Sequence, residues 1–540
     1  MRTIPRLVWA YALLIMILTS LPYIVAAINT PEGYTYTGAV SQPAGVAVDY
    51  FSHLAKMEQG RRGDWDYHLL FTSEDHPGAP LVQGFYVALG WASAFDLPVT
   101  YHIMRAALTF GLIIMLWVFG MRFFPRSGDR WVFMLFGTLV TGVSWLLLIF
   151  DPVQSAQVAP IEFWLIDAYH LSGALFMPHF SAAVILQLIA VLLFFNRQII
   201  ALTVALALLT IVQPYIILLT VPLFSLLLLR DFVGKRITFA AVIPFVLPFA
   251  VQAGLTLYQF NAAQSDPVWQ SFTAQNITSS PPPIYYLLGY LPFLIPIALL
   301  IRPRQILAAL MPVPQKPAPD APTNSARVLL LFILWILIVA VLLYLPIPTQ
   351  RRYLIGVQTP LAALATVGWV TLMRRLPERT RPLLTIGYVG IAAAPLAFLI
   401  ISNIASRPVD LYLSPTESAG YTWIRRETTP DDVILTTFDW SGRGSGGKLA
   451  AFTGRRVFIG HWIETAHFSD KIVLIERFYD PAESETWRCE FLRDYGVDYV
   501  WYDDYARAAG TLDPETVPCL QRMIASAGDQ LIIYQVVDPL

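Results

Sequence analysis

An acidic residue, Asp49, is the strongest candidate for chemistry in this chain. It lies in a polar stretch, residues 29–98, that follows the first apolar segment. On a helix over residues 44–59, Asp49, His53 and Lys56 would share one face. The opposite face would hold Ala47, Tyr50, Phe51, Leu54 and Met57. This pattern predicts a helix in the plane of the membrane surface, where a carboxylate can meet a lipid headgroup and act as a general base.

Cationic residues form the second candidate group. Arg351 and Arg352 are the one arginine pair at an outer junction between apolar segments, against the usual trend. Planar guanidinium groups bind phosphates well, so the pair predicts a phosphate or diphosphate headgroup site. The alternative is that both side chains reach ordinary lipid phosphates. Arg105, near the start of the second span, should face the protein interior, as part of the phosphate site or in a structural ion pair with an acid such as Asp49.

Other polar residues are candidates for substrate contact. Asp167, in the outer loop over residues 151–170, would be a second carboxylate opposite Asp49, suited to acceptor activation or metal binding. The remaining candidates have less support, because polar residues are common in solvated loops: His53, Asp64, Glu162, His179 and His461. No spacing among them specifies a metal, so metal dependence is left open.

Composition indicates what kind of protein must position these residues. Of 540 residues, 56% are hydrophobic and 14% are charged, whereas a soluble domain carries about 25% charged residues. The chain is therefore a polytopic membrane protein. Its net charge of −1 does not indicate a partner, because in membrane proteins the informative quantity is where Lys and Arg lie between spans.

Uncharged runs predict eleven membrane-spanning helices. They lie near residues 7–28, 99–121, 131–150, 171–195, 198–212, 214–229, 237–259, 284–301, 328–348, 353–373 and 382–404. Basic residues gather at alternate junctions, which places the N-terminus in the cytoplasm. The run over residues 198–229 is interpreted as a hairpin that turns at Gln213-Pro214, and residues 80–95 as a helix at the outer membrane face.

The composition changes at Asp410. Strand-like runs at residues 433–438, 456–459, 499–502 and 531–536 alternate with helical patterns at 416–426, 469–478, 484–495 and 517–527. This predicts a small α/β domain with a mainly parallel sheet, on the outer side of the membrane. Its two cysteines, Cys489 and Cys519, could form a disulfide or remain as buried thiols. The segment Gly442–Lys448 spells G-x-x-x-x-G-K, but Leu449 follows, so a flexible glycine loop is favoured over a phosphate-binding loop.

The layout resembles the GT-C superfamily of integral membrane glycosyltransferases, in particular the protein mannosyltransferases and aminoarabinose transferases. The resemblance covers residues 1–405, with the α/β domain over residues 410–540 appended. It rests on Val48-Asp49-Tyr50, Gly63-Asp64-Trp65, Pro77-Gly-Ala-Pro80-Leu81, Arg105, Pro178-His179-Phe180 and Arg351-Arg352-Tyr353. The Trp-Trp-Asp-Tyr-Gly motif of oligosaccharyltransferases is absent.

The resemblance implies a polyprenyl-phosphate-linked sugar donor, a glycan, lipid or protein acceptor, and a location in the inner membrane. It assigns Asp49 to the acceptor and, by analogy, a single displacement that inverts the anomeric centre. No nucleic-acid partner is expected. Two other classes stay open: a lipid or sugar transporter, for which we find no internal repeats, and a catalytically inactive membrane assembly or binding protein.

Overall fold

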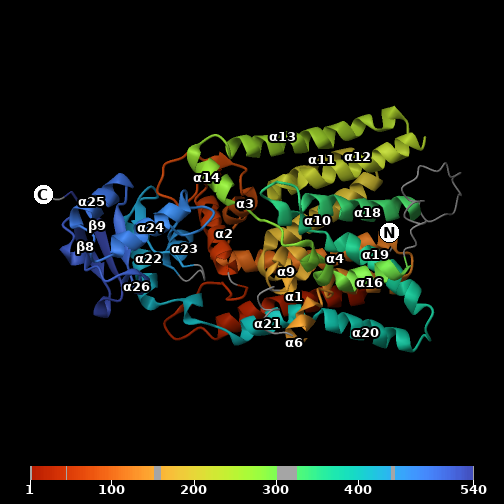
Figure 1. The fold of residues 1–540 in the computed structure, drawn as a ribbon, viewed down its shortest axis with the longest axis horizontal. Coiled ribbons are helices and arrows are strands. Elements are labelled where there is room, and N and C mark those ends of the chain that lie inside the picture. Colours follow the sequence, from red (N-terminus) through yellow and green to blue (C-terminus); the bar gives the residue numbers. More distant parts are fainter. Residues whose placement is uncertain (1–2, 44, 151–159, 301–324, 440–443, 539–540) are drawn as a thin grey trace. The chain divides into compact units, whose positions relative to one another are not determined.

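The computed structural model describes residues 3–43, 45–150, 160–300, 325–439 and 444–538. The chain forms two compact units, each built from distant segments (Figure 1). The helical unit comprises Met1–Ser20, Met104–Tyr258 and Thr278–Ile401. The sheet unit comprises Leu21–Ile103, Gln259–Ile277 and Ser402–Leu540. Residues 29–98 fall within the sheet unit, and the predicted domain division, which groups them with the apolar helices, stays a prediction.

The helical unit contains most of the apolar helices, four of which begin or end within segments of the sheet unit. Their bounds are α1 Arg6–Ile28, α4 Leu97–Phe123, α5 Ser127–Thr138, α6 Leu147–Phe150, α8 Ile161–Trp164, α9 His170–Phe176, α10 Pro178–Phe195, α11 Ile199–Val212, α12 Ile217–Val233, α13 Val246–Ala262, α15 Pro283–Gly289, α16 Leu291–Leu300, α18 Ser325–Leu342, α19 Gln358–Met373, α20 Thr380–Ala392 and α21 Ala394–Ala405. Helix α19 packs against α5, α16 and α18, and α10 packs against α11.

Five helical stretches in the described residues are long and apolar enough to cross a membrane. They are Arg6–Ile28, Leu97–Phe123, Pro178–Phe195, Pro214–Val233 and Phe239–Ala262. The pair α20 and α21, bent by 51°, would add a sixth. The chain breaks at Gln213 as predicted, but the expected span near residues 131–150 is wrong, because α5 ends at Thr138. Eleven spans are therefore not established.

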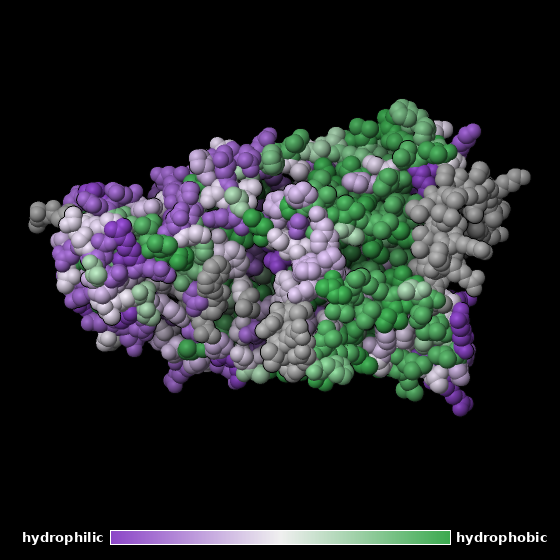
Figure 2. All heavy atoms as spheres, viewed as in Figure 1, coloured by the Kyte–Doolittle hydropathy of each residue, from purple (hydrophilic) through white to green (hydrophobic). Residues whose placement is uncertain are grey.

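Large hydrophobic side chains cover much of the helical unit's visible surface (Figure 2). Ile200, Phe239 and Leu383 are each about 70% exposed. Such a continuous apolar surface is unfavourable in water and suits contact with lipid acyl chains. The fold therefore supports a membrane protein, as the composition predicts.

The sheet unit is built around a five-stranded sheet in the order β6-β5-β7-β9-β8. The strands are β5 Val433–Leu435, β6 Arg456–Val457, β7 Tyr499–Tyr502, β8 Leu520–Ala525 and β9 Ile532–Val536. β6, β5 and β7 are parallel, whereas β9 and β8 run antiparallel to their neighbours. The expected helix over residues 517–527 is wrong. Apolar residues there do have helical spacing, but pairing with β9 draws the segment into an edge strand.

Helices cover both faces of this sheet, which is why its central strands β5 and β7 are buried along their whole length. These helices are α22 Pro415–Glu427, α23 Ser445–Thr453, α24 Phe468–Tyr479, α25 Glu485–Asp494 and α26 Asp504–Ala509. Val433 and Leu435 point to the core shared with α24 and α25, while Ile434 points to the core shared with α22 and α23. A disulfide joins Cys489 to Cys519.

The N-terminal polar stretch forms part of the sheet unit. Its elements are β1 Thr35–Tyr36, α2 Val46–Arg61, β2 Asp66–Tyr67, β3 Ala79–Pro80 and α3 Gly84–Trp91, while α14 Pro267–Gln275 comes from the second segment of the unit, Gln259–Ile277. β1 pairs with β4 Tyr412–Leu413, and β2 pairs with β3. Ala55, Leu70 and Phe71 belong to the core on one face of the sheet. The two regions therefore share one hydrophobic core.

Helix α2 is enclosed by protein, which differs from the expected helix on a membrane surface. It packs against α3 and against α23. Lys56, expected on the exposed polar face, is buried, and the ring of His53 stacks on Tyr86 at a centroid distance of 3.9 Å. Close packing is made possible by Gly60 and Gly90, where an added Cβ would lie 1.9 Å from a carbonyl oxygen of the facing helix.

We expect Gly60→Ala to destabilise the sheet unit, because its Cβ would collide with the Val87 carbonyl of α3. Overpacking of this kind typically costs about 1–3 kcal/mol. Gly128→Ala is the control, since nothing lies within 4 Å of a Cβ at that position. Thermal unfolding of the purified proteins measures both. Equal melting temperatures for Gly60→Ala and the wild type would show that α2 and α3 do not pack this closely.

Candidate functional site

Asp49 lies in the first turn of α2, where the helix dipole favours a negative charge. Its side chain is 34% exposed and is therefore partly accessible to solvent. Oδ1 lies 3.3 Å from Nε2 of His461, which follows strand β6. Within the described part of the chain, His461 is the one side chain that hydrogen-bonds this carboxylate. Two predicted site residues, 412 positions apart in sequence, are thus brought together.

The surroundings of His461 determine which ring nitrogen carries a hydrogen. Nδ1 accepts hydrogen bonds from the backbone N–H groups of Ile463 and Glu464, at 3.2 and 3.3 Å. A neutral imidazole with an acceptor at Nδ1 bears its hydrogen at Nε2, and that hydrogen is directed to Asp49. The ring is buried and stacks on Trp462 at a centroid distance of 4.8 Å. His461 therefore acts as a fixed donor to the carboxylate.

A buried ion pair lies beside this hydrogen bond. Oε1 of Glu464 accepts from Lys56 Nζ at 2.7 Å and from Ser52 Oγ at 2.6 Å, while Oε2 accepts from Tyr67 O–H at 2.6 Å. Burial alone would raise the pKa of Glu464, but the charge of Lys56 and these hydrogen bonds lower it. Glu464 is therefore an anion that holds the turn after β6 against α2.

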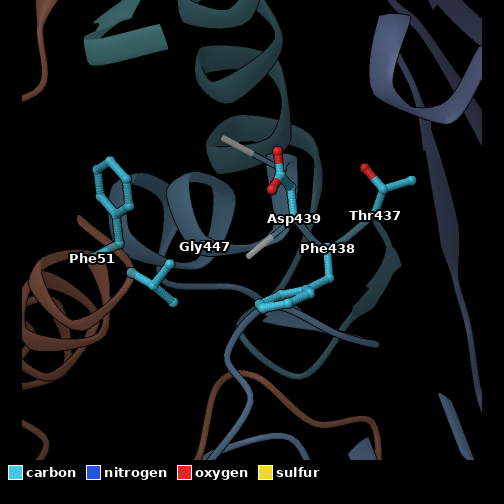
Figure 3. A pocket seen from close by; sticks show the side chains of 8 residues that line it. Phe51, Thr437, Phe438, Asp439 and Gly447 are labelled. Atoms are coloured by element: carbon cyan, nitrogen blue, oxygen red, sulfur yellow. The ribbon is translucent and has the colours of Figure 1, made fainter. Parts of the chain in front are cut away.

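A small hollow lies next to Asp49 along α2. Val48 and Phe51 line it from α2, while Thr437, Phe438 and Asp439 line it from the end of β5 (Figure 3). The remaining lining residues are Gly444, Gly447 and Gly460. The hollow is therefore at the carboxyl ends of parallel strands, where α/β sheets commonly bind ligands. Lys448, in the glycine-rich segment, is buried and paired with Glu417 at 3.2 Å, so its ammonium group is not directed at a phosphate.

The helical unit contains a second group of predicted site residues. Asp167 is buried between α8 and α9, and its Oδ1 lies 3.4 Å from Nη1 of Arg352. Asp167 also lines a hollow together with residues of α9, α10 and the segment before α19, including Tyr169, His170 and Gly356. The structure thus brings together a predicted acid and a predicted cation.

Arg351 contacts an aromatic ring. Its guanidinium lies over the ring of Trp164, 5.7 Å from the centroid. Its buried Nε atom has no hydrogen-bond partner among the described residues. The backbone at this point is fixed, since Arg351 N–H donates to the Thr278 carbonyl at 3.0 Å. A guanidinium that packs on an aromatic ring and keeps an unpaired N–H group can bind an anionic ligand.

Solved structures provide the comparison, since no protein-family model and no curated protein matches this sequence. One match is the archaeal oligosaccharyltransferase AglB from Archaeoglobus fulgidus in complex with an inhibitory peptide and a dolichol-phosphate. It is 10% identical with a TM-score of 0.50, over 97% of this chain and 74% of that chain. Another is the Archaeoglobus fulgidus oligosaccharyltransferase tethered with an acceptor peptide containing the NVT sequon via a disulfide bond. It is 12% identical with a TM-score of 0.50, over 91% and 69% of the two chains. The chain shares the fold of this oligosaccharyltransferase.

This match agrees with the predicted GT-C-like architecture at the level of the fold. The closer resemblance to protein mannosyltransferases and aminoarabinose transferases stays a prediction. The Trp-Trp-Asp-Tyr-Gly motif remains absent from this sequence.

The other predicted site residues have contacts within the protein. Arg105 is buried and donates to the Thr19 carbonyl at 3.1 Å and to Ser20 Oγ at 3.2 Å. Glu162 is buried and accepts from Trp145 N–H at 2.8 Å. Both residues therefore have contacts consistent with a structural role.

Two further candidates lie at chain turns. Asp64 accepts from the N–H of Asp66 at 3.0 Å, and His179, near the start of α10, packs against Phe180. No group of three His, Cys, Asp or Glu side chains in the described residues could hold a metal ion. Metal dependence therefore stays open, as it does from the sequence.

Sequence reasoning missed the buried network around Glu464. A signal was present, because Asp49, Ser52 and Lys56 recur at helical spacing and so lie on one face of α2. That face was interpreted as exposed to solvent. A lysine on the same helix face as a catalytic candidate can instead form a buried ion pair with an acidic residue elsewhere in the chain.

We expect Glu464→Gln to destabilise the sheet unit by about 3–5 kcal/mol, since it leaves the buried Lys56 ammonium without a carboxylate. The pH dependence should change as well. Because folding lowers the pKa of Glu464, its contribution to stability is present above its ordinary pKa of 4.5 and is lost as the pH falls through the folded-state value. Thermal unfolding from pH 3 to pH 7 should therefore show a shallower acid-side slope in the variant.

Asp504→Asn is the matched control, because Asp504 forms an ion pair with Arg507 at the surface, with its side chain 83% exposed. It should change stability far less. Equal losses in the two variants would mean that the Lys56–Glu464 pair does not stabilise the unit beyond an ordinary surface pair.

Proposed function

We propose that this protein is a membrane glycosyltransferase that moves a sugar from a polyprenyl-phosphate donor to an acceptor at the outer membrane face. The observation that carries the proposal is Asp49, a partly exposed carboxylate oriented by a buried histidine in a chain with the fold of an oligosaccharyltransferase. The acceptor is a glycan, a lipid or a protein.

The donor assignment is supported by the cations of the helical unit. The AglB structure is a complex with a dolichol-phosphate. In the present chain Arg351 carries an unused donor, and Arg352 is oriented by Asp167. We assign both to the phosphate of the donor. Outside the membrane, a sugar activated on a lipid phosphate is the plausible substrate, because nucleotide sugars are cytoplasmic.

The proposed reaction is a single displacement. The acceptor hydroxyl gives its proton to Asp49 while its oxygen bonds to the anomeric carbon. The bond from that carbon to the phosphate oxygen breaks, and the lipid phosphate leaves with the electron pair. Attack from the face opposite the leaving group inverts the anomeric centre. Asp167 orients Arg352.

The proposed orientation has a cytoplasmic N-terminus and an extracytoplasmic sheet unit in the inner membrane. The distribution of basic residues between the apolar segments supports it. The Cys489–Cys519 disulfide supports it independently, because disulfides persist in oxidising compartments.

Two alternatives are an inactive membrane assembly or binding protein and a lipid or sugar transporter. The ordered donor from His461 to Asp49 favours an enzyme over a binding protein, since a merely solvated acid needs no such partner. The match to a glycosyltransferase fold favours an enzyme over a transporter. A measured sugar transfer decides between the three.

We expect Asp49→Asn to lower the turnover of sugar transfer by about 10²–10⁴-fold, the usual contribution of a general base. Affinity for the lipid-linked donor should stay within a few-fold of the wild type, because the amide keeps the shape of the carboxylate. The measurement is transfer from a radiolabelled polyprenyl-phosphate sugar in detergent, with melting temperature on the same sample. Asp470→Asn, in the first turn of α24, is the control and should transfer normally. Wild-type turnover by Asp49→Asn would refute the base.

We expect Arg351→Ala to weaken donor binding by about 10-fold to 10²-fold, since a hydrogen bond to a charged group contributes roughly 1.5–3 kcal/mol. Arg352→Ala should weaken it similarly. Arg374→Ala is the control, because Arg374 pairs with Asp129 at another junction. Equilibrium binding of the lipid-phosphate sugar to each folded variant is the measurement. Unchanged affinity in the double variant would identify the pair as contacts to ordinary lipids.

A further inference from the structure

The turn after β6 contacts the Asp49-bearing face of α2 at two points. At one point His461 Nε2 lies 3.3 Å from Asp49 Oδ1. At the other, Glu464 accepts from Ser52 and Lys56. Asp49, Ser52 and Lys56 are three and four residues apart, so they follow one another along a single face of the helix.

We propose that His461 is a positioning residue for the transfer reaction, which holds Asp49 so that its second oxygen faces the acceptor. This inference rests on the proposed function. In this arrangement the Lys56–Glu464 pair fixes the position of the turn along the axis of α2. The His461–Asp49 hydrogen bond fixes the rotation of the carboxylate. Oδ1 is then occupied by a donor, and Oδ2 is the oxygen that receives the acceptor proton.

The hydrogen bonds within the turn exclude a base role for His461 itself. Its Nδ1 lone pair already accepts from the N–H groups of Ile463 and Glu464. A hydrogen on Nδ1 would turn this acceptor into a donor that faces the two backbone N–H groups, and both hydrogen bonds of the turn would be lost. With its hydrogen at Nε2 and its lone pair occupied, the ring can donate to Asp49 but cannot take up the acceptor proton.

The surroundings of the His461 ring fix its orientation. The charged and titratable groups that face it are Asp49 and Glu464, with Lys56 and Tyr67 beyond Glu464. Aromatic rings pack on it, Trp462 at 4.8 Å and Phe71 at 5.8 Å between centroids. The backbone N–H of His461 donates to Thr465 Oγ1 at 3.4 Å. Its rotation is therefore restricted on several sides, as a positioning role requires.

Two substitutions separate the functions of the two ring nitrogens. In His461→Asn the amide oxygen can take the place of Nδ1 as acceptor, but no donor reaches Asp49. In His461→Gln the amide nitrogen can take the place of Nε2, so a donor to Asp49 is kept. We expect His461→Asn to lower turnover by roughly 10-fold to 10²-fold, the effect of a misplaced catalytic group. His461→Gln should recover turnover to within a few-fold of the wild type.

The deciding measurement repeats His461→Asn in the Asp49→Asn background. A residue that acts only through Asp49 has no further effect once the base is removed, so the double variant should turn over like Asp49→Asn alone. Melting temperature and donor affinity are measured on the same samples, and the positioning role predicts a change in kcat with donor affinity unchanged.

Equal fold losses from His461→Asn in both backgrounds, or wild-type turnover by His461→Asn, would overturn the positioning role while leaving the proposed function intact. Full activity of Asp49→Asn would instead overturn the base assignment. The two failures are therefore distinguishable in one set of proteins.

Discussion

The buried ion pair between Lys56 and Glu464 is the interaction on which the arrangement of the sheet unit depends. Two opposite charges in an interior site are tolerated only when each is satisfied, and here Ser52 and Tyr67 supply the additional hydrogen bonds. The pair joins α2 to a turn more than 400 residues later. Because the pair needs close contact and defined geometry, it specifies how helix and turn meet, and the His461–Asp49 hydrogen bond follows from that placement.

Close packing between backbones imposes a second constraint on the same helix. Gly60 and Gly90 let α2 and α3 approach until carbonyl oxygens occupy the space of a side chain. On the other side, α2 packs against α23 of the sheet layer. A helix held on both sides has little freedom to tilt or slide. The base proposed for acceptor activation therefore stands on a rigid element, and both the N-terminal loop and the C-terminal region are needed to make it rigid.

In the helical unit, the arginine side chains lie in apolar surroundings and need partners there. Arg105 is buried and donates to a backbone carbonyl and a hydroxyl, Arg352 is paired with Asp167, and Arg351 lies on Trp164. A cation in such a site requires a partner of this kind. The three arginines thus have three kinds of partner: backbone and hydroxyl oxygens, a carboxylate and an aromatic face.

The sequence by itself determined the membrane class, the break at Gln213, most strands of the sheet and the chemical candidates. Each of these depends on local composition or on the position of charges in the sequence, and neither requires knowledge of tertiary contacts. Asp49 was identified by its place on a helix, Arg352 by a charge against the usual trend, and Asp167 by its place in an outer loop. The pairing of the last two, and of Asp49 with His461, was decided only by the tertiary structure.

Tertiary contacts also decided the points where sequence reasoning was wrong. Lys56 is buried because its partner Glu464 is distant in sequence, so no local pattern could distinguish a solvated face from a satisfied one. The segment over residues 520–525 is a strand because β9 offers an open edge, which outweighs its helical spacing. Local patterns specify which residues can do chemistry. Long-range hydrogen bonds and packing specify which of them meet.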